Sequence, residues 1–296
     1  MTTETRQAIS AQVAAKFGFS VDKFPLSGPD GMKTPFYGLF RSDTAEVVHD
    51  KSVSFNYTPH TTDDVVTLVE CAEEIFGDCS PRCHFRKGHY VELAPSRDQR
   101  LAVYGTRDNV FPRMLISAGY NGDSFRVTLG YYRDLCRNLA MMSSVSGTSV
   151  SIRHDTNLRT KMDELVQQMQ GLRDGWSNLQ DTIVRMESAQ VSLSSFMERM
   201  YGEPPTQEGS ARTRHENRTA SIVRRVIRER NLSGRPAFDG VNDNVSWWEA
   251  YNAVQGYSQH DQSRRGTVTA FDRELLANNS QEVKRAERMA ITALAA

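Results

Sequence analysis

Apolar and polar residues follow two different periods along the chain. Between residues 35 and 156, apolar side chains recur mostly at alternate positions, which is typical of strands with one buried face. A helix interrupts this pattern after Thr61, which can cap the helix together with Asp64 in a weak capping box. These patterns predict an α+β fold in which a mixed or antiparallel sheet packs on helices. The apolar face of the interrupting helix is formed by Val65, Leu68, Val69, Ala72 and Ile75.

Several segments within residues 35–156 predict individual elements. Residues 35–58 predict two strands around a turn at Ser42-Asp43, and residues 82–93 predict a hairpin with Lys87-Gly88 in its turn. Residues 131–142 predict a helix. Further strands are predicted at 101–104, 113–117, 125–129 and 148–154, with a turn at 121–123.

The strongest periodic pattern runs from Leu158 to Met200. When the chain is stepped alternately by four and three residues, twelve of thirteen positions are apolar. Such a 3.5-residue repeat is typical of helices that pack with a left-handed twist. The pattern predicts a long helix over 157–201, and Gly171 and Gly175 are the places where it could break into two. Two interpretations remain open, an antiparallel helix pair within the chain and an oligomeric coiled coil.

The last third of the chain predicts shorter helices. Residues 202–215 predict a linker, and an Arg-rich helix follows near Ser221–Asn231. Ser246 and Glu249 form a capping box for a helix over 247–259, and a last helix is predicted over 271–295. The expected organisation is therefore an N-terminal helix and loop at 1–34, the sheet domain at 35–156 and a helix-rich region at 157–296.

Composition narrows the class of protein. The chain is 39% hydrophobic and 24% charged, which is typical of a soluble globular protein. No apolar run approaches the roughly 18 residues of a membrane helix, and the first residues do not resemble a secretory signal. Four cysteines do not make a disulfide framework. We therefore expect a cytoplasmic protein without cofactor, metal or membrane partner.

The zero net charge of the chain conceals an uneven distribution. Residues 1–80 carry six basic and twelve acidic side chains, a net of −6, whereas residues 211–235 carry eight arginines and two glutamates, a net of +6. Arginine supplies 29 of the 36 basic side chains. Because a guanidinium binds phosphate through a planar fork of donors, this excess favours specific phosphate contacts.

Motifs for catalysis or metal binding are weak. The chain contains no P-loop, no G-x-G-x-x-G and no H-E-x-x-H sequence. Cys79, Cys83, His84 and His89 do not have the spacing of a standard zinc site, so we expect ordinary loop and strand residues there. An enzyme of unknown reaction around His154 and Asp155 remains an alternative.

A basic surface with interleaved aromatic side chains is the usual chemistry for binding single-stranded nucleic acid. The Arg-rich helix and the strands offer this combination. The alternative is a solvated helix face whose arginines pair with the acidic residues 1–80. The candidate phosphate-binding residues are Arg126, Arg133, Arg153, His154, Arg224, Arg225 and Arg228, and the candidate stacking residues are Phe125 and Tyr131.

Several short sequence segments, taken together, resemble those of one protein family. Residues 133–139 resemble its R-V-V-C-x-N-T-L element, 151–154 match its S-I-R-H strand end, and 247–260 are similar to its W-x-x-x-N-A-V-x-x-Y-x-x-H helix. Residues 55–64 and the turn at 120–124 resemble two further elements, although Tyr120 replaces a His and Asp134 a Val. The family is an uncharacterised bacteriophage and plasmid family, the domain of unknown function 932. The motif residues are Cys136, Asn138, Trp247, Asn252 and His260.

The resemblance covers roughly residues 35–265 and implies a phage or plasmid origin, without an established activity. The order of strands and helices is also loosely similar to that of phage single-strand annealing proteins. The leading hypothesis is a nucleic-acid-binding protein that binds or anneals single-stranded DNA in replication or recombination, self-associates through the long helix or the sheet, and performs no turnover. The main alternative is a non-catalytic protein that binds a host factor through the long helix.

Overall fold

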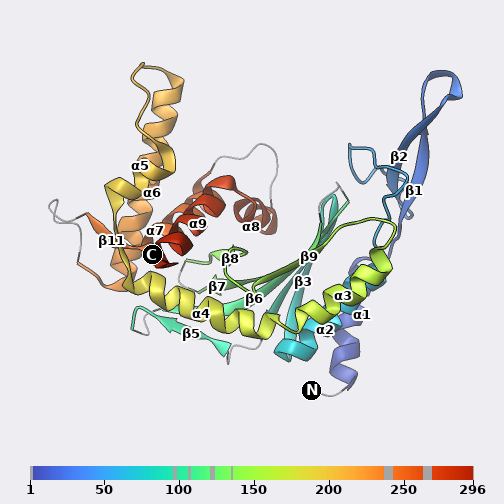
Figure 1. The fold of residues 1–296 in the computed structure, drawn as a ribbon, viewed down its shortest axis with the longest axis horizontal. Helices are drawn as coiled ribbons and strands as arrows, with labels where there is room; N and C mark the ends of the chain where they lie inside the picture. The colour runs from blue at the N-terminus through green and yellow to red at the C-terminus, as the bar shows by residue number, and fades with distance from the viewer. Residues whose placement is uncertain are drawn as a thin grey trace. The chain divides into compact units, whose positions relative to one another are not determined.

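The computed structural model describes residues 3–95, 99–105, 108–120, 124–134, 136–236, 243–262 and 269–295, with side chains from residue 9 onward. The strands of the main sheet follow one another in sequence and pair antiparallel, and most of the helices come after them, which confirms the α+β fold (Figure 1). The turn predicted at 121–123 lies outside the described residues. In the described part of the chain, no helix combines the length and the apolar character needed to cross a membrane.

The main sheet has seven strands in the described part of the chain. Their order is β3-β4-β6-β7-β8, with β5 paired to β6 and β9 paired to β7. The register of the β3/β4 hairpin, from Cys79 opposite Pro95 to Phe85 opposite His89, confirms the hairpin predicted around Lys87-Gly88. The strands are β3 (Cys79–Phe85), β4 (Gly88–Pro95), β5 (Leu101–Val103), β6 (Asp108–Gly119), β7 (Phe125–Arg133), β8 (Leu139–Met141) and β9 (Ser149–Ile152).

The helix predicted over 131–142 is wrong. Strand β7 continues to Arg133, and β8 returns beside it with Tyr131 opposite Ala140. Gly130 allows this close pairing, because a Cβ at that position would overlap the carbonyl oxygen of Ala140. The turn between the two strands contains Arg137 in the left-handed region, at φ 54°.

Residue contacts divide the chain into two compact units, neither of which is continuous in sequence. Strands β6 and β7 and helix α4 (Leu172–Ser188) contribute residues to both units. Unit 1 comprises Met1–Gln99, Pro112–Leu129 and Gly147–Trp176, and unit 2 comprises Arg100–Phe111, Gly130–Ser146 and Ser177–Ala296.

In unit 1, helix α2 (Thr62–Phe76) packs against both α1 (Thr3–Lys16) and α3 (Leu158–Met169), and each of the three helices contacts the sheet. The predicted capping box starts α2. The Thr61 hydroxyl accepts from the Asp64 N–H at 3.2 Å, and the Asp64 carboxylate accepts from the Thr61 N–H at 2.7 Å. Gly77 ends the helix at φ 79°, a backbone conformation that favours glycine.

A separate two-stranded ribbon extends from unit 1 (Figure 1). It consists of β1 (Val21–Ser27) and β2 (Lys33–Arg41), joined through the short turn η1 (Pro29–Gly31). The prediction of two strands around a turn at Ser42-Asp43 is confirmed only in part, because β2 forms but the segment after the turn is not a continuous strand. The β2 strand pairs with the segment before it, and residues 47 and 53 make only single bridges to β2.

The predicted long helix is interrupted twice. It forms α3, α4, the short strand β10 (Gln190–Ser192) and α5 (Leu193–Tyr201). Gly171 lies at the first break, and Ser192 caps α5 after the second by accepting from the Ser195 N–H. All twelve apolar positions of the repeat are buried. The stripe is therefore covered within a single chain, which favours the intramolecular interpretation over the oligomeric coiled coil.

Unit 2 holds most of the C-terminal helices. The Arg-rich helix α6 begins at Ser210, inside the predicted linker, and ends at Gly234 in the left-handed conformation. The predicted capping box of Ser246 and Glu249 is confirmed at the start of α7, whereas the predicted last helix is two helices. The elements are α6 (Ser210–Ser233), β11 (Asn244–Ser246), α7 (Trp247–Gly256), the π-helical turn η3 (Tyr257–Asp261), α8 (Ala270–Asn278) and α9 (Gln281–Ala295).

Candidate anion site in unit 2

A buried arginine ties three elements of unit 2 together. Arg133, at the end of β7, is fully buried, with its Nη2 2.5 Å from a carboxylate oxygen of Asp108 and its Nη1 2.7 Å from one of Glu229. A buried guanidinium requires such partners, because an uncompensated charge in the interior is costly. The guanidinium has no exposed surface, so the predicted phosphate contact of Arg133 does not fit the structure.

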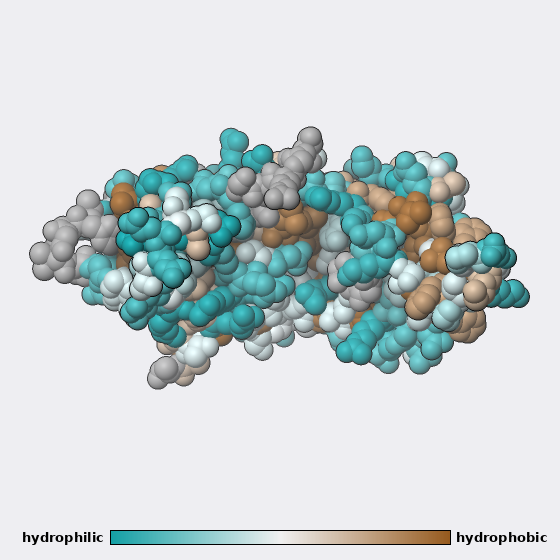
Figure 2. Space-filling model, turned by 90° about the horizontal axis from the view of Figure 1, so that it is seen from above, coloured by the Kyte–Doolittle hydropathy of each residue, from teal (hydrophilic) through white to brown (hydrophobic). Residues whose placement is uncertain are grey.

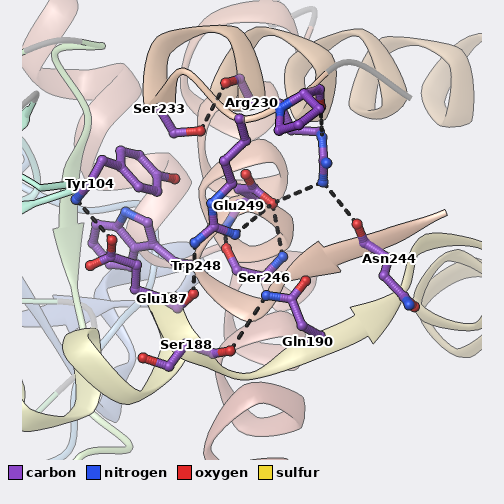
Figure 3. Close-up of polar contacts among 12 residues, drawn as sticks. Tyr104, Glu187, Ser188, Gln190, Arg230, Ser233, Asn244, Ser246, Trp248 and Glu249 are labelled. Carbon is purple, nitrogen blue, oxygen red and sulfur yellow. Dashed lines mark hydrogen bonds and ion pairs between the residues drawn. The ribbon is translucent and has the colours of Figure 1, made fainter. Parts of the chain in front are cut away.

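A second buried charge cluster fixes α6 against the start of α7. Glu249 is fully buried, and its Oε2 accepts from the Ser246 N–H at 2.8 Å. The Nη1 atoms of Arg230 and Arg235 each lie 3.6 Å from the same oxygen. Arg230 also donates to the carbonyl of Asn244 at 2.8 Å, and Figure 3 shows its side chain reaching from α6 toward Glu249 and β11. These two arginines therefore hold the fold together.

Most arginines of the +6 segment are paired, but not with residues 1–80. Within residues 211–235, five of the eight arginines have an acidic partner, and every one of those acids lies between residues 216 and 282. The predicted candidate Arg225 is one of them, with two hydrogen bonds of 2.5 and 2.7 Å to Asp261. Arg224 and Arg228 are exposed, and Arg224 donates to the Ser221 hydroxyl at 2.8 Å.

Two residues of the sequence motifs, 122 positions apart, meet in unit 2. His260 Nε2 lies 3.0 Å from Asn138 Oδ1, so this ring nitrogen carries the hydrogen and donates it. Asn138 is fully buried in the turn between β7 and β8. Gln259 holds the same turn by donating to the carbonyl of Arg137 at 3.1 Å and accepting from the Leu139 N–H at 3.2 Å. The side chains of η3 thus fix both the turn and the orientation of the His260 ring.

The change from α7 to η3 positions these side chains. A π-helical turn widens the helix by one residue and occurs frequently at functional sites. Gly256 lies immediately before it, and a Cβ there would come within 2.7 Å of an Arg225 nitrogen. The absent side chain therefore leaves the space through which Arg225 reaches Asp261.

A hollow of about 290 Å³ opens beside His260, and we call it the His260 hollow. Two of its arginines, Arg137 and Arg273, come from the β7–β8 turn and from α8. Arg137 keeps a positive φ without being glycine, a strained conformation that concentrates at ligand sites. The lining residues are Arg137, Gln259, His260, Ala270, Arg273 and Glu274.

The charges around the His260 hollow are unbalanced. Burial lowers the pKa of His260, Arg225, Arg228 and Arg273 lower it further, and Asp261 opposes them. With His260 neutral, the net charge around the hollow is +2. It comes from four arginines, at 137, 225, 228 and 273, and two acids, at 261 and 274. The surroundings of this hollow therefore favour an anion.

The other predicted residues of unit 2 are structural. Tyr131 is fully buried and donates to Asn252 Oδ1 at 3.1 Å, so it does not fit the predicted role of stacking on a base. Trp247 is buried edge-on against Phe196. Burial raises the pKa of the Cys136 thiol to about 11, so it stays protonated and unreactive at neutral pH.

Unit 1 contains the remaining candidates in a cluster of rings. His154 lies nearly parallel to Tyr57 and to Phe125, with ring centroids 5.4 and 5.8 Å apart. Phe125 is fully buried, so the predicted base stacking does not fit it either. The Asp155 carboxylate pairs with Lys161, whose hydrogen bond lowers its pKa, so Asp155 is committed to a different partner from the one that a His154–Asp155 enzyme would need.

A histidine pair in the same ring cluster is not evident from the sequence, because its members lie on separate elements. His60 Nε2 is 2.8 Å from His89 Nδ1, and the Tyr120 hydroxyl donates to the His60 carbonyl at 2.9 Å. Nearby Arg153 is exposed and Arg126 half-buried. Across the described residues, no group of three or more His, Cys, Asp or Glu side chains is arranged to hold a metal ion.

Comparison with known proteins gives one match that covers most of the chain. A protein-family model described as "Domain of unknown function (DUF932)" matches residues 49–289. This range includes every residue that lines the His260 hollow. No curated protein and no solved structure matches the chain.

Proposed function

This chain belongs to the DUF932 family, and because that description assigns no activity, we propose from the geometry that the protein binds nucleic acid through phosphate contacts in the His260 hollow. One observation carries the proposal. Arg137 and Arg273 converge beside His260, in surroundings with two excess positive charges. The two arginines stand 136 positions apart in sequence and meet only through the fold.

The chemistry of the hollow suits a phosphate group. Arginine forks bind phosphate with paired, charge-assisted hydrogen bonds. The volume of about 290 Å³ is at the lower limit of small-molecule sites, so it suits one phosphodiester or a comparable small anion rather than a large ligand. Asn138 holds the His260 ring in place, so the polar lining is positioned before a ligand arrives.

Single-stranded DNA is the first ligand to test. The sequence resemblance favours it, and a role in phage or plasmid replication or recombination, in the cytoplasm, rests on that resemblance alone. The predicted stacking residues are buried, so the contacts we expect are to the backbone, with little dependence on base sequence. The helix-mediated binding of a host factor has less support, because the apolar stripe on which it depends is buried.

The test is fluorescence anisotropy with a labelled single-stranded oligonucleotide, repeated with the duplex, between about 50 and about 200 mM salt. Each phosphate neutralised on a single strand contributes about 0.7 to the slope of log affinity against log salt. Because Arg137 and Arg273 share one phosphodiester in the hollow, Arg137→Gln with Arg273→Gln should lower that slope by about 0.7. Arg214→Gln is the matched control, since Arg214 is exposed on α6 and does not line the hollow.

Two results would overturn the proposal. One is the absence of binding at the lowest salt concentration. The other is an equal loss of affinity in the Arg214 control and in the double variant, which would indicate diffuse attraction rather than a site. Preference for the duplex would retain the phosphate site and reject single-stranded DNA as its main ligand.

A further inference from the structure

The ribbon of β1 and β2 is apolar on both faces. On its inner face, Leu39 and Val21 are buried in a cluster with Val48 and Val53. On its outer face, Phe24 and Phe40 touch with ring centroids 5.7 Å apart. A sheet with one face in water normally carries polar side chains on that face. Apolar side chains on both faces therefore indicate that the outer face of the ribbon is covered in the working protein.

The register identifies the remaining residues of the outer face. Gly38 is opposite Phe24, and a Cβ at Gly38 would meet both Leu26 and Phe40, so these side chains share one side. Phe36 precedes Gly38 by two residues and belongs to the same side, because side chains in a strand alternate. Phe24 and Phe36 are each 54% exposed.

Exposed apolar side chains concentrate in this region. Among the described side chains, five of the eight large hydrophobic residues that are exposed lie between residues 24 and 55. Figure 2 shows hydrophobic atoms, in brown, toward the right of the view, on the side where Figure 1 draws the ribbon. Exposed apolar side chains that gather in one region of the surface mark interaction sites. The five residues are Phe24, Met32, Phe36, Val47 and Phe55.

The outer face has both a hollow and a protrusion. A hollow of about 450 Å³ lies at the base of the ribbon, lined by Phe24 and Phe40 together with Asp22, Arg41, Ser42 and Ala45. Phe36 is exposed nearer the tip, four residues from Phe40, which corresponds to roughly 13 Å along a strand. A surface of this form is complementary to itself, because a two-fold axis midway between the two features brings each over its counterpart.

We propose that the outer face of the ribbon joins two copies of this chain, with Phe36 of each copy in the hollow of the other. Residues 21–45 carry three acidic and three basic side chains, so two ribbons meet without a net repulsion between them. The lining of the hollow contains one acid and one base, Asp22 and Arg41, so neither sign dominates the contact.

Packing through the face is favoured over strand addition at the edge. Pro25 in β1 and Pro35 in β2 have no N–H to donate, and prolines of this kind block pairing at strand edges. A phenylalanine buries about 150–250 Å² in full, so the exposed parts of Phe24 and Phe36 supply roughly 100 Å² each. Even with their neighbours, the two copies bury less than the roughly 1,200 Å² of a standard interface, so the dimer is weak and depends on concentration.

Sedimentation velocity of the full chain without DNA, from about 1 µM to about 1 mM, tests the proposal. The wild type should shift from monomer to dimer over this range, and Phe36→Ser should remain a monomer. Ile227→Ser is the matched control, since it removes an exposed apolar side chain from α6 and should dimerise like the wild type. Phe24→Ser, which alters the hollow rather than the protrusion, should also remain a monomer.

Circular dichroism of each variant checks that the fold is intact. We expect it to be, because about half of each phenylalanine side chain is exposed. A wild type that remains a monomer at the highest concentration would overturn the proposal and would leave a different partner for the ribbon. Dimerisation of Phe36→Ser at wild-type concentrations would overturn it as well. DNA binding by the His260 hollow is measured separately, and neither result depends on the other.

Discussion

Replacing Arg133 with methionine tests the charge network of unit 2. The change removes the guanidinium that lies 2.5 Å from a carboxylate oxygen of Asp108 and 2.7 Å from one of Glu229, and the two acids are only 2% and 4% exposed. Breaking a buried ion pair by removing one partner costs about 3–5 kcal/mol, because an uncompensated charge remains. Two carboxylates remain here, so we expect a loss at the upper end of that range.

Urea unfolding followed by tryptophan fluorescence measures this loss. Two of the three tryptophans, Trp247 and Trp248, lie in unit 2, and the Trp248 ring centroid is 5.4 Å from the Arg133 guanidinium carbon. A wild-type domain has a free energy of unfolding of about 5–15 kcal/mol, so the variant should unfold at a much lower urea concentration.

A second substitution distinguishes uncompensated charge from lost packing. Glu229→Gln added to the variant removes one of the two carboxylates left without a partner, and it should restore part of the lost stability at pH 7. A loss below about 1 kcal/mol, or one that Glu229→Gln does not reduce, would refute the reasoning.

Two further predictions concern unit 1 and the sheet. Burial lowers the pKa of His60 and that of His89, the latter to about 3, so the unfolded state binds protons that the folded state does not. Stability should fall as pH drops below about 6.5, by about 1.4 kcal/mol per pH unit for each histidine, and acid unfolding of His60→Phe should show a shallower slope. Gly130→Ala should destabilise the protein by more than about 2 kcal/mol because its Cβ overlaps Ala140, whereas Gly171→Ala, with its nearest neighbour 3.4 Å away, should not. Equal melting temperatures of the two alanine variants would contradict the second expectation.

Local signals in the sequence predict the elements that depend on neighbouring residues. The capping boxes at Thr61 and Ser246 were predicted because each needs only a hydroxyl and an acid three residues later. The apolar stripe beginning at Leu158 was predicted because its repeat also depends only on the spacing of residues close in sequence. The continuation of the strand predicted at 125–129 to Arg133 was not predicted, because its pairing depends on the contact between Gly130 and a strand that follows a turn.

The candidate site shows the same limit. Asn138 and His260 were identified from the sequence motifs of the family, and their side chains contact each other. Arg273 carries no signal in the sequence, since only the fold brings α8 beside the turn that contains Arg137. Arg133 was placed in the wrong role because its acids lie 25 and 96 residues away, and sequence alone does not indicate which of many arginines will be neutralised.

The discontinuous make-up of the two units has a consequence for how the protein assembles and how it can be dissected. The chain passes from one unit to the other five times, and three of these crossings fall inside β6, β7 and α4. No cut in the backbone releases either unit as a continuous fragment. Deletions designed to separate the units would therefore disrupt both, and deletion mapping would not assign an activity to one of them. Folding must also complete pairings between distant parts of the sequence before either core closes, which predicts slow folding for a chain of this size.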